Sequence, residues 1–145
     1  MAETLKLTPG QSIEIVESTP EALVLEVTYA PEGSEPPAHW HPEQDEHFEV
    51  VEGHIRTRID GQTRDYDAGA TIEIARGMVH QMWNPRKTEA RLVWRTTPRG
   101  PTEEWFRAID ALQRETGAGP SPSPQAFADL LAEYQDVFRL GAPDA

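Results

Sequence analysis

The chain has 145 residues, enough for one domain with its own hydrophobic core. Its formal net charge of -12 disfavours nucleic acid and anionic membranes as partners, because both require basic surface. Cysteine is absent, which excludes disulfides and sulfur-ligated metals, so a bound metal must take nitrogen and oxygen ligands. No stretch approaches the roughly 18 apolar residues of a membrane span, and the N-terminus has no apolar signal region, so we expect a cytoplasmic protein.

Residues 1–100 contain short segments that alternate apolar and polar side chains, the pattern of half-buried β-strands. In ALVLEVTYA, residues 22–30, one face would carry Leu23, Leu25, Val27 and Tyr29. Residues 54–60 and 62–67 flank Gly61 and predict a hairpin with an Asp60-Gly61 turn. Further strands are expected at residues 12–18, 47–52, 71–74 and 91–97. Many short strands at close spacing predict a sandwich or barrel.

The pattern changes after Pro98, where apolar residues recur at helical spacing. A first helix is expected from an N-cap at Thr102 to Gly117, with an apolar stripe of Trp105, Ile109 and Leu112. A second would begin with Ser123 as cap and Pro124 as first helical residue, and would stop at Gly141 and Pro143. Its apolar stripe consists of Phe127, Leu130, Leu131, Tyr134, Val137 and Phe138.

These patterns divide the chain into a β domain, residues 1–100, and a helical extension, residues 101–145. An amphipathic pair of helices is expected to pack on the β domain or on a second subunit. A lid over a pocket is the alternative role for the extension.

Three of the five histidines lie in HWHPEQDEHFEVVEG, residues 39–53. His39 and His41 are two positions apart and share a face if the segment is extended, which the neighbouring prolines favour. In the following strand Glu46 shares a face with the apolar Phe48 and Val50, whereas His47 takes the other face. A carboxylate on a buried face needs a partner, because burying it unpaired is costly, and two imidazoles around a shared metal would supply one.

The segment from Gly33 to Gly53, GSEPPAHWHPEQDEHFEVVEG, resembles the first signature motif of the cupin superfamily. That motif is a glycine, five residues, HxH, three or four residues, a glutamate, six residues and a glycine. GATIEIARGMVHQMWN, from Gly69 to Asn84, resembles the second motif, G-x5-P-x-G-x2-H-x3-N, with Ala75 in place of the usual proline. The chain is thus identified, by resemblance, as a small single-barrel bacterial cupin.

The resemblance implies a mainly β fold: an antiparallel barrel of double-stranded β-helix or jelly-roll type, here followed by two C-terminal α-helices. It also implies one divalent metal per chain, held by His39, His41, Glu46 and His80. Such ligands suit Fe, Mn, Ni, Cu or Zn, and the sequence does not choose among these metals. His47 and His54 match no ligand position. Cupins are commonly dimers, so a homodimer is expected through an exposed sheet face.

The superfamily includes enzymes and non-catalytic binders, so three functions stay open. The first is a metal-dependent dioxygenase acting on an enol, diketone or flavonol-like compound, with Glu46 as ligand or catalytic base. The second is a non-redox isomerase, decarboxylase or lyase of a small carbonyl compound or sugar, with Tyr29, Tyr66 or His54 as proton shuttle. The third is a non-catalytic binder of a small ligand. The expected substrate pocket comprises Phe48, Val50, Met82, Asn84 and Trp94.

Overall fold

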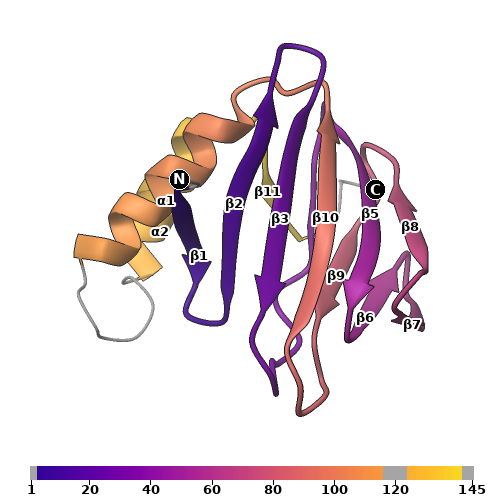
Figure 1. The fold of residues 1–145 in the computed structure, drawn as a ribbon. Coiled ribbons are helices and arrows are strands. Elements are labelled where there is room, and N and C mark those ends of the chain that lie inside the picture. Colours follow the sequence, from indigo (N-terminus) through magenta and orange to yellow (C-terminus); the bar gives the residue numbers. More distant parts are fainter. Residues whose placement is uncertain (1–2, 116–123, 142–145) are drawn as a thin grey trace.

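The computed structural model describes residues 3–115 and 124–141, and two antiparallel sheets make up most of it (Figure 1). The six-stranded sheet has the order β1 (Thr4–Thr8), β2 (Gln11–Ser18), β3 (Leu23–Tyr29), β10 (Ala90–Thr97), β5 (Asp45–Glu52), β8 (Thr71–Ile74). The five-stranded sheet has the order β11 (Arg139–Leu140), β4 (His39–Trp40), β9 (His80–Trp83), β6 (His54–Ile59), β7 (Gln62–Asp67). This mainly β architecture confirms the predicted jelly roll with two C-terminal helices.

Alternation along the central strands decides which side chains enter the core. On β3 the predicted inward row of Leu23, Leu25 and Val27 is fully buried. On β5 the buried row is Glu46, Phe48 and Val50, as the sequence predicted, while the residues between them are more exposed. Trp94 of β10 pairs in register with Phe48, and their rings stack 5.2 Å apart. The ladder therefore places the Glu46 carboxylate inside an apolar core.

Two turns explain why particular glycines occur where they do. Asp60 and Gly61 both have positive φ, 50° and 82°, and join β6 to β7 in the predicted two-residue hairpin. Gly53, the last residue of the first motif, has φ 84°, and a Cβ there would lie 2.5 Å from the Glu89 carbonyl oxygen. Only glycine fits that close approach between the end of β5 and the start of β10.

Helix α1 (Thr102–Glu115) lies against the edge strand β1 (Figure 1). The Lys6 amide donates to the Asp110 carboxylate over 2.8 Å, and the Gln113 side chain donates to the Leu7 carbonyl over 3.1 Å. The apolar side of the helix is buried, with Trp105, Phe106 and Ile109 in the core. The helix thus covers the β1 edge of the six-stranded sheet.

The second helix is shorter than predicted. Helix α2 spans Pro124–Glu133, and the chain then turns through residues 134–137 and enters the two-residue strand β11. The expectation that one helix carries Val137 and Phe138 is wrong, because this stretch pairs with the edge of β4 and buries Val137. The predicted terminators and cap at Gly117, Ser123 and Pro143 lie outside the described residues.

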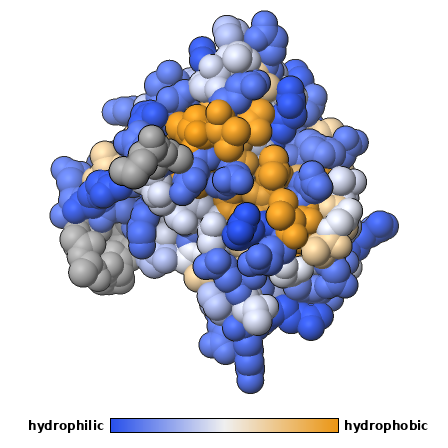
Figure 2. All heavy atoms as spheres, viewed as in Figure 1, coloured by the Kyte–Doolittle hydropathy of each residue, from blue (hydrophilic) through white to orange (hydrophobic). Residues whose placement is uncertain are grey.

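Figure 2 shows apolar side chains gathered on the outer face of the six-stranded sheet, surrounded by polar ones. Val16 on β2 and Val51 on β5 are exposed by 59% and 46%. The homodimer expected through a sheet face stays a prediction, as does a cytoplasmic location. Neither of the two described helices is long and apolar enough to cross a membrane.

Candidate metal centre

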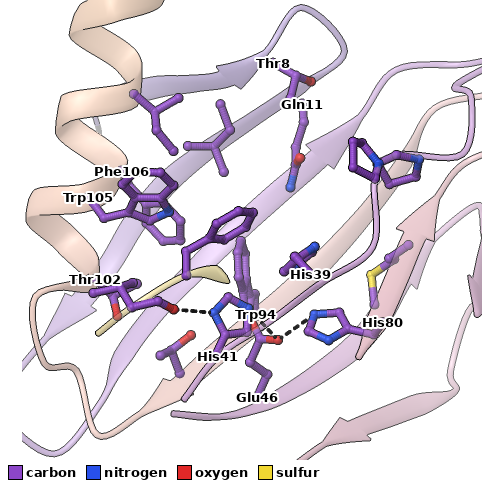
Figure 3. A pocket seen from close by; sticks show the side chains of 18 of the residues that line it. Thr8, Gln11, His39, His41, Glu46, His80, Trp94, Thr102, Trp105 and Phe106 are labelled. Carbon is purple, nitrogen blue, oxygen red and sulfur yellow. Dashed lines mark hydrogen bonds and ion pairs between the residues drawn. The ribbon is translucent and has the colours of Figure 1, made fainter. Parts of the chain in front are cut away.

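Three short elements bring the two histidine motifs together. His39 lies on β4 directly opposite His80 on β9, and His41 follows two residues after His39. The ligand nitrogens of these three residues lie within 4.8 Å of one another. Figure 3 shows the three rings close to Glu46, which reaches them from β5. The four residues that the resemblance implied as ligands therefore converge at one place.

Main-chain carbonyls fix the tautomers of two of these imidazoles. His80 Nδ1 lies 2.9 Å from the Met78 oxygen, and His41 Nδ1 lies 2.7 Å from the Val137 oxygen. A carbonyl can only accept, so Nδ1 carries the hydrogen in both rings. The lone pair of each neutral ring is then on Nε2, which faces the centre of the cluster. Metal-binding histidines usually have this arrangement, with the remote N–H held by an oxygen.

Glu46 links the histidines to the core. Its Oε1 lies 3.3 Å from His41 Nε2 and 3.2 Å from His80 Nε2, and its Oε2 accepts a 2.9 Å hydrogen bond from the Trp94 indole. Burial alone would raise the pKa of Glu46, but the adjacent rings of His41 and His80 hold it well below its usual range. Glu46 is therefore an anion at neutral pH although it is only 4% exposed.

The histidines respond differently to this environment. Burial, together with the neighbouring His80 and His41, holds the pKa of His39 well below its usual value, which keeps that ring neutral. Burial also acts to lower the pKa of His41, but the Glu46 carboxylate outweighs it and the pKa is raised. A divalent cation bound here would displace the proton that Glu46 stabilises on His41, because a histidine must be unprotonated at the nitrogen that binds metal.

The donor set fits a metal on a second ground. His41 Nε2 and Glu46 Oε1 are buried, and neither has a hydrogen-bond partner of good geometry within residues 3–115 and 124–141. Buried polar atoms normally have partners, because an unsatisfied one costs about 1–3 kcal/mol. A divalent ion bound among His39, His41 and His80, with Glu46 beside them, would satisfy both atoms.

A cavity of about 350 Å³ opens from these residues into the barrel. Its walls are mostly apolar and aromatic, and they include Phe48, Met82 and Trp94 from the predicted pocket. Val50 and Asn84 are placed elsewhere: Val50 is core, and the Asn84 amide donates to the carbonyls of Tyr29, Ala30 and Thr88. Asn84 thus holds the loops around the end of β3. The Gly33 amide also donates a hydrogen bond to the main-chain oxygen of Asn84.

Of the three proton-shuttle candidates, Tyr29 alone is among the described residues that line the cavity. Burial, reinforced by the Glu46 charge, raises the pKa of its phenol, so Tyr29 is protonated and can donate. Gln11 Nε2 donates to the phenol oxygen over 3.3 Å. His54 is held by Asp67 on the neighbouring strand, over 2.9 Å. His47 faces outward beside Glu73, on the strand face opposite Glu46.

The sequence did not point to four other residues at this site. Thr96 and Thr102 line the cavity with buried hydroxyls that have no hydrogen-bond partner among the described residues. Thr102 was expected to cap α1, but it is the first residue of the helix, and its buried hydroxyl has no hydrogen-bond partner among the described residues. Val137 and Phe138 reach the site from the C-terminal segment. A strand signal was available there, since VFRL combines β-branched and aromatic residues just before Gly141.

Comparison with known proteins identifies the family. Residues 25–95, which carry all four candidate ligands, match the Cupin domain family (Cupin_2). The chain belongs to the cupin superfamily. The solved structure of KdgF from Halomonas sp. superimposes on this cupin with a TM-score of 0.61 at 20% identity, over 70% of this chain and 92% of KdgF. A sugar phosphate isomerase of the superfamily from Silicibacter pomeroyi gives a TM-score of 0.57 at 23% identity, over 63% and 61% of the two chains.

One curated relative is similar in sequence. The tetracenomycin polyketide synthase protein TcmJ of Streptomyces glaucescens is 26% identical over 86 residues. The match covers 59% of this cupin and 55% of TcmJ, so the chain spans about half the length of that relative. These similarities establish the fold and family of the protein.

Proposed function

We propose that this cupin is a metal-dependent enzyme, a dioxygenase, that acts on a small apolar compound carrying an enol or a β-diketone. The observation that carries the proposal is the position of the three histidines and Glu46 at one end of an apolar, aromatic cavity of about 350 Å³. Such a cavity binds the carbon skeleton of an apolar ligand, while its few polar groups orient the oxygens.

The cavity lining argues against a phosphorylated sugar as substrate. Among the described residues that line it there is no lysine or arginine. A phosphate group requires such cations or a set of main-chain amides, because an unpaired dianion is costly to bury. Nearby polar side chains are also engaged or exposed: Gln81 donates to the Pro36 carbonyl, and Arg91 and Arg95 lie on the surface.

Residues of this chain would hold the metal, accept the substrate proton and exclude water. A divalent ion at His39, His41 and His80 would act as a Lewis acid and, if redox-active, as an electron source for dioxygen. The Trp94 N–H holds Glu46 Oε2, so Oε1 is the oxygen available to serve as fourth ligand or to accept the enol proton of a substrate. Phe48, Trp94 and Phe106 exclude water from the same space.

The relationship to TcmJ supports the substrate class and a second reaction. Polyketide chains carry carbonyl groups at alternate carbons, which are β-dicarbonyl units, and TcmJ is named as a polyketide synthase protein. The second candidate function is therefore non-redox enolisation of such a unit, followed by isomerisation, decarboxylation or elimination. Tyr29 supports it, because its raised pKa keeps a proton donor in the cavity.

An oxygen electrode and anaerobic assays separate these functions. The protein, after metal analysis, is incubated with acetylacetone, dibenzoylmethane and quercetin in air and under argon. Oxygen consumption that matches substrate loss and stops on chelation supports the dioxygenase. Product formed equally under argon supports the second reaction. Tight metal-dependent binding without turnover on any compound would refute catalysis and leave a ligand-binding protein.

A further inference from the structure

The two histidines that carbonyls orient differ in where those carbonyls come from. The His80 ring is held by the Met78 carbonyl, two residues earlier in the chain. The His41 ring is held from far away in the sequence: its Nδ1 donates to the Val137 oxygen, 96 residues away. The family match ends at residue 95, so the partner of His41 lies in a part of the chain outside that match.

The segment Tyr134–Leu140, hereafter the C-terminal strap, is fixed to the histidine strand by several contacts. Leu140 pairs with His39 in the β11–β4 ladder, and the Gly141 amide donates to the Ala38 carbonyl over 2.9 Å. The Phe138 ring stacks on His39 with centroids 4.6 Å apart and planes inclined by 19°. The same ring lies 5.9 Å from His41. The strap therefore touches two of the three candidate ligands.

The strap also connects the site to the helical extension. Phe138 and Tyr134 contact the Trp105 ring of α1, with centroids 5.2 Å and 5.3 Å away. Val137 is 1% exposed, and its carbonyl points at His41 from within the core. Eight of the described residues that line the cavity belong to the extension, residues 101–145. The extension thus supplies a wall of the cavity as well as a contact to a ligand.

We propose that the C-terminal strap is a positioning element of the metal centre: the Val137 carbonyl holds His41 with Nε2 facing inward, and Phe138 holds the His39 ring. The strap fixes the orientation of the His41 ring before a metal binds. Metal binding then costs less free energy, because the ring does not have to be ordered at that moment. The inference rests on the metal centre of the proposed function and is independent of which reaction occurs there.

The tautomer of His41 in the apo protein tests whether the Val137 carbonyl orients this ring. Long-range 1H–15N NMR spectra of the full-length apo protein are recorded as a pH series, and the tautomer is read where the His41 signals show a neutral ring. We expect His41 to carry its hydrogen on Nδ1, and a chain that ends at Glu133 to show a mixture of tautomers. A full-length protein with the His41 hydrogen on Nε2 would overturn the assignment.

Co2+ affinity tests whether the strap, including the Phe138 ring, positions the metal ligands. Co2+ is titrated into the wild type, into the chain that ends at Glu133, into Phe138→Ala, and into Leu130→Ala. Leu130 is a matched control, because it is a partly buried apolar residue of the same extension that lies outside the described cavity lining. Loss of an orienting partner lowers metal affinity by about 10- to 100-fold.

We expect the Co2+ affinity of the truncated chain to fall by about 10- to 100-fold, and that of Phe138→Ala to fall by at least about 3-fold. The visible absorption band of bound Co2+ should be altered in both variants. Leu130→Ala should bind like the wild type and show the wild-type band. Wild-type affinity and spectrum in Phe138→Ala, or equal losses in Phe138→Ala and Leu130→Ala, would overturn the proposal. Because these readouts use Co2+ alone, a missing oxygenase activity would refute the proposed reaction and leave this inference standing.

Discussion

The hydrogen bond between Trp94 and Glu46 should contribute measurably to the stability of the apo protein. Its donor and acceptor are 2.9 Å apart, and both side chains are buried, with 7% and 4% exposed. A hydrogen bond to a charged group contributes about 1.5–3 kcal/mol. Trp94→Phe removes the donor and keeps an aromatic ring where the indole contacts Phe48 and Phe106.

A double-mutant cycle isolates this interaction from the altered packing. Urea unfolding is measured, with a chelator present, for the wild type, Trp94→Phe, Glu46→Leu and the double variant. Leucine cannot accept a hydrogen bond, so the coupling free energy should equal the whole contribution, about 1.5–3 kcal/mol. A coupling below about 0.5 kcal/mol would lie within ordinary additivity error and would refute the assigned role of Trp94.

Three further predictions concern the frame of the site. Gly53→Ala should destabilise the protein clearly more than Gly69→Ala, since both have positive φ but only Gly53 meets the Glu89 oxygen; equal losses in urea midpoint would contradict this. Asn84→Ala should cost about 2–3 kcal/mol, through its lost hydrogen bonds, yet retain one Co2+ per chain; a folded variant without metal would place Asn84 at the site. Deleting residues 101–145 should uncover apolar core and increase dye binding and aggregation; a soluble truncation with unchanged dye fluorescence would show that the extension is dispensable for packing.

The part of the site that the sequence predicted follows from local geometry. Strand alternation has a period of two, so the inward positions of Glu46, Phe48 and Val50 follow once the segment is known to be a strand. The same rule placed His47 outside. His80 could not be assigned by alternation, because its face is mixed, and it was recognised only through the spacing of the second motif.

The part that the sequence did not predict depends on tertiary contacts. The apolar residues from Phe127 to Phe138 fit a helical stripe, so periodicity extends the helix beyond Glu133, where it actually ends. The chain leaves the helix because the edge of β4 offers main-chain pairing and the space beside His39 accepts the Phe138 ring. Asn84 was predicted to line the pocket. Its amide instead donates hydrogen bonds to main-chain carbonyls, a tertiary contact that the sequence pattern does not reveal.

Metal stoichiometry in matched histidine variants tests the central claim most directly. Apo protein is titrated with Co2+ for the wild type, His41→Ala, His80→Ala and His47→Ala, and the bound metal is measured after dialysis. We predict one ion per chain in the wild type and in His47→Ala, whose side chain lies on the outer face, and loss of stoichiometric binding in the other two. Full occupancy and wild-type affinity in His41→Ala or His80→Ala would contradict the metal centre described above.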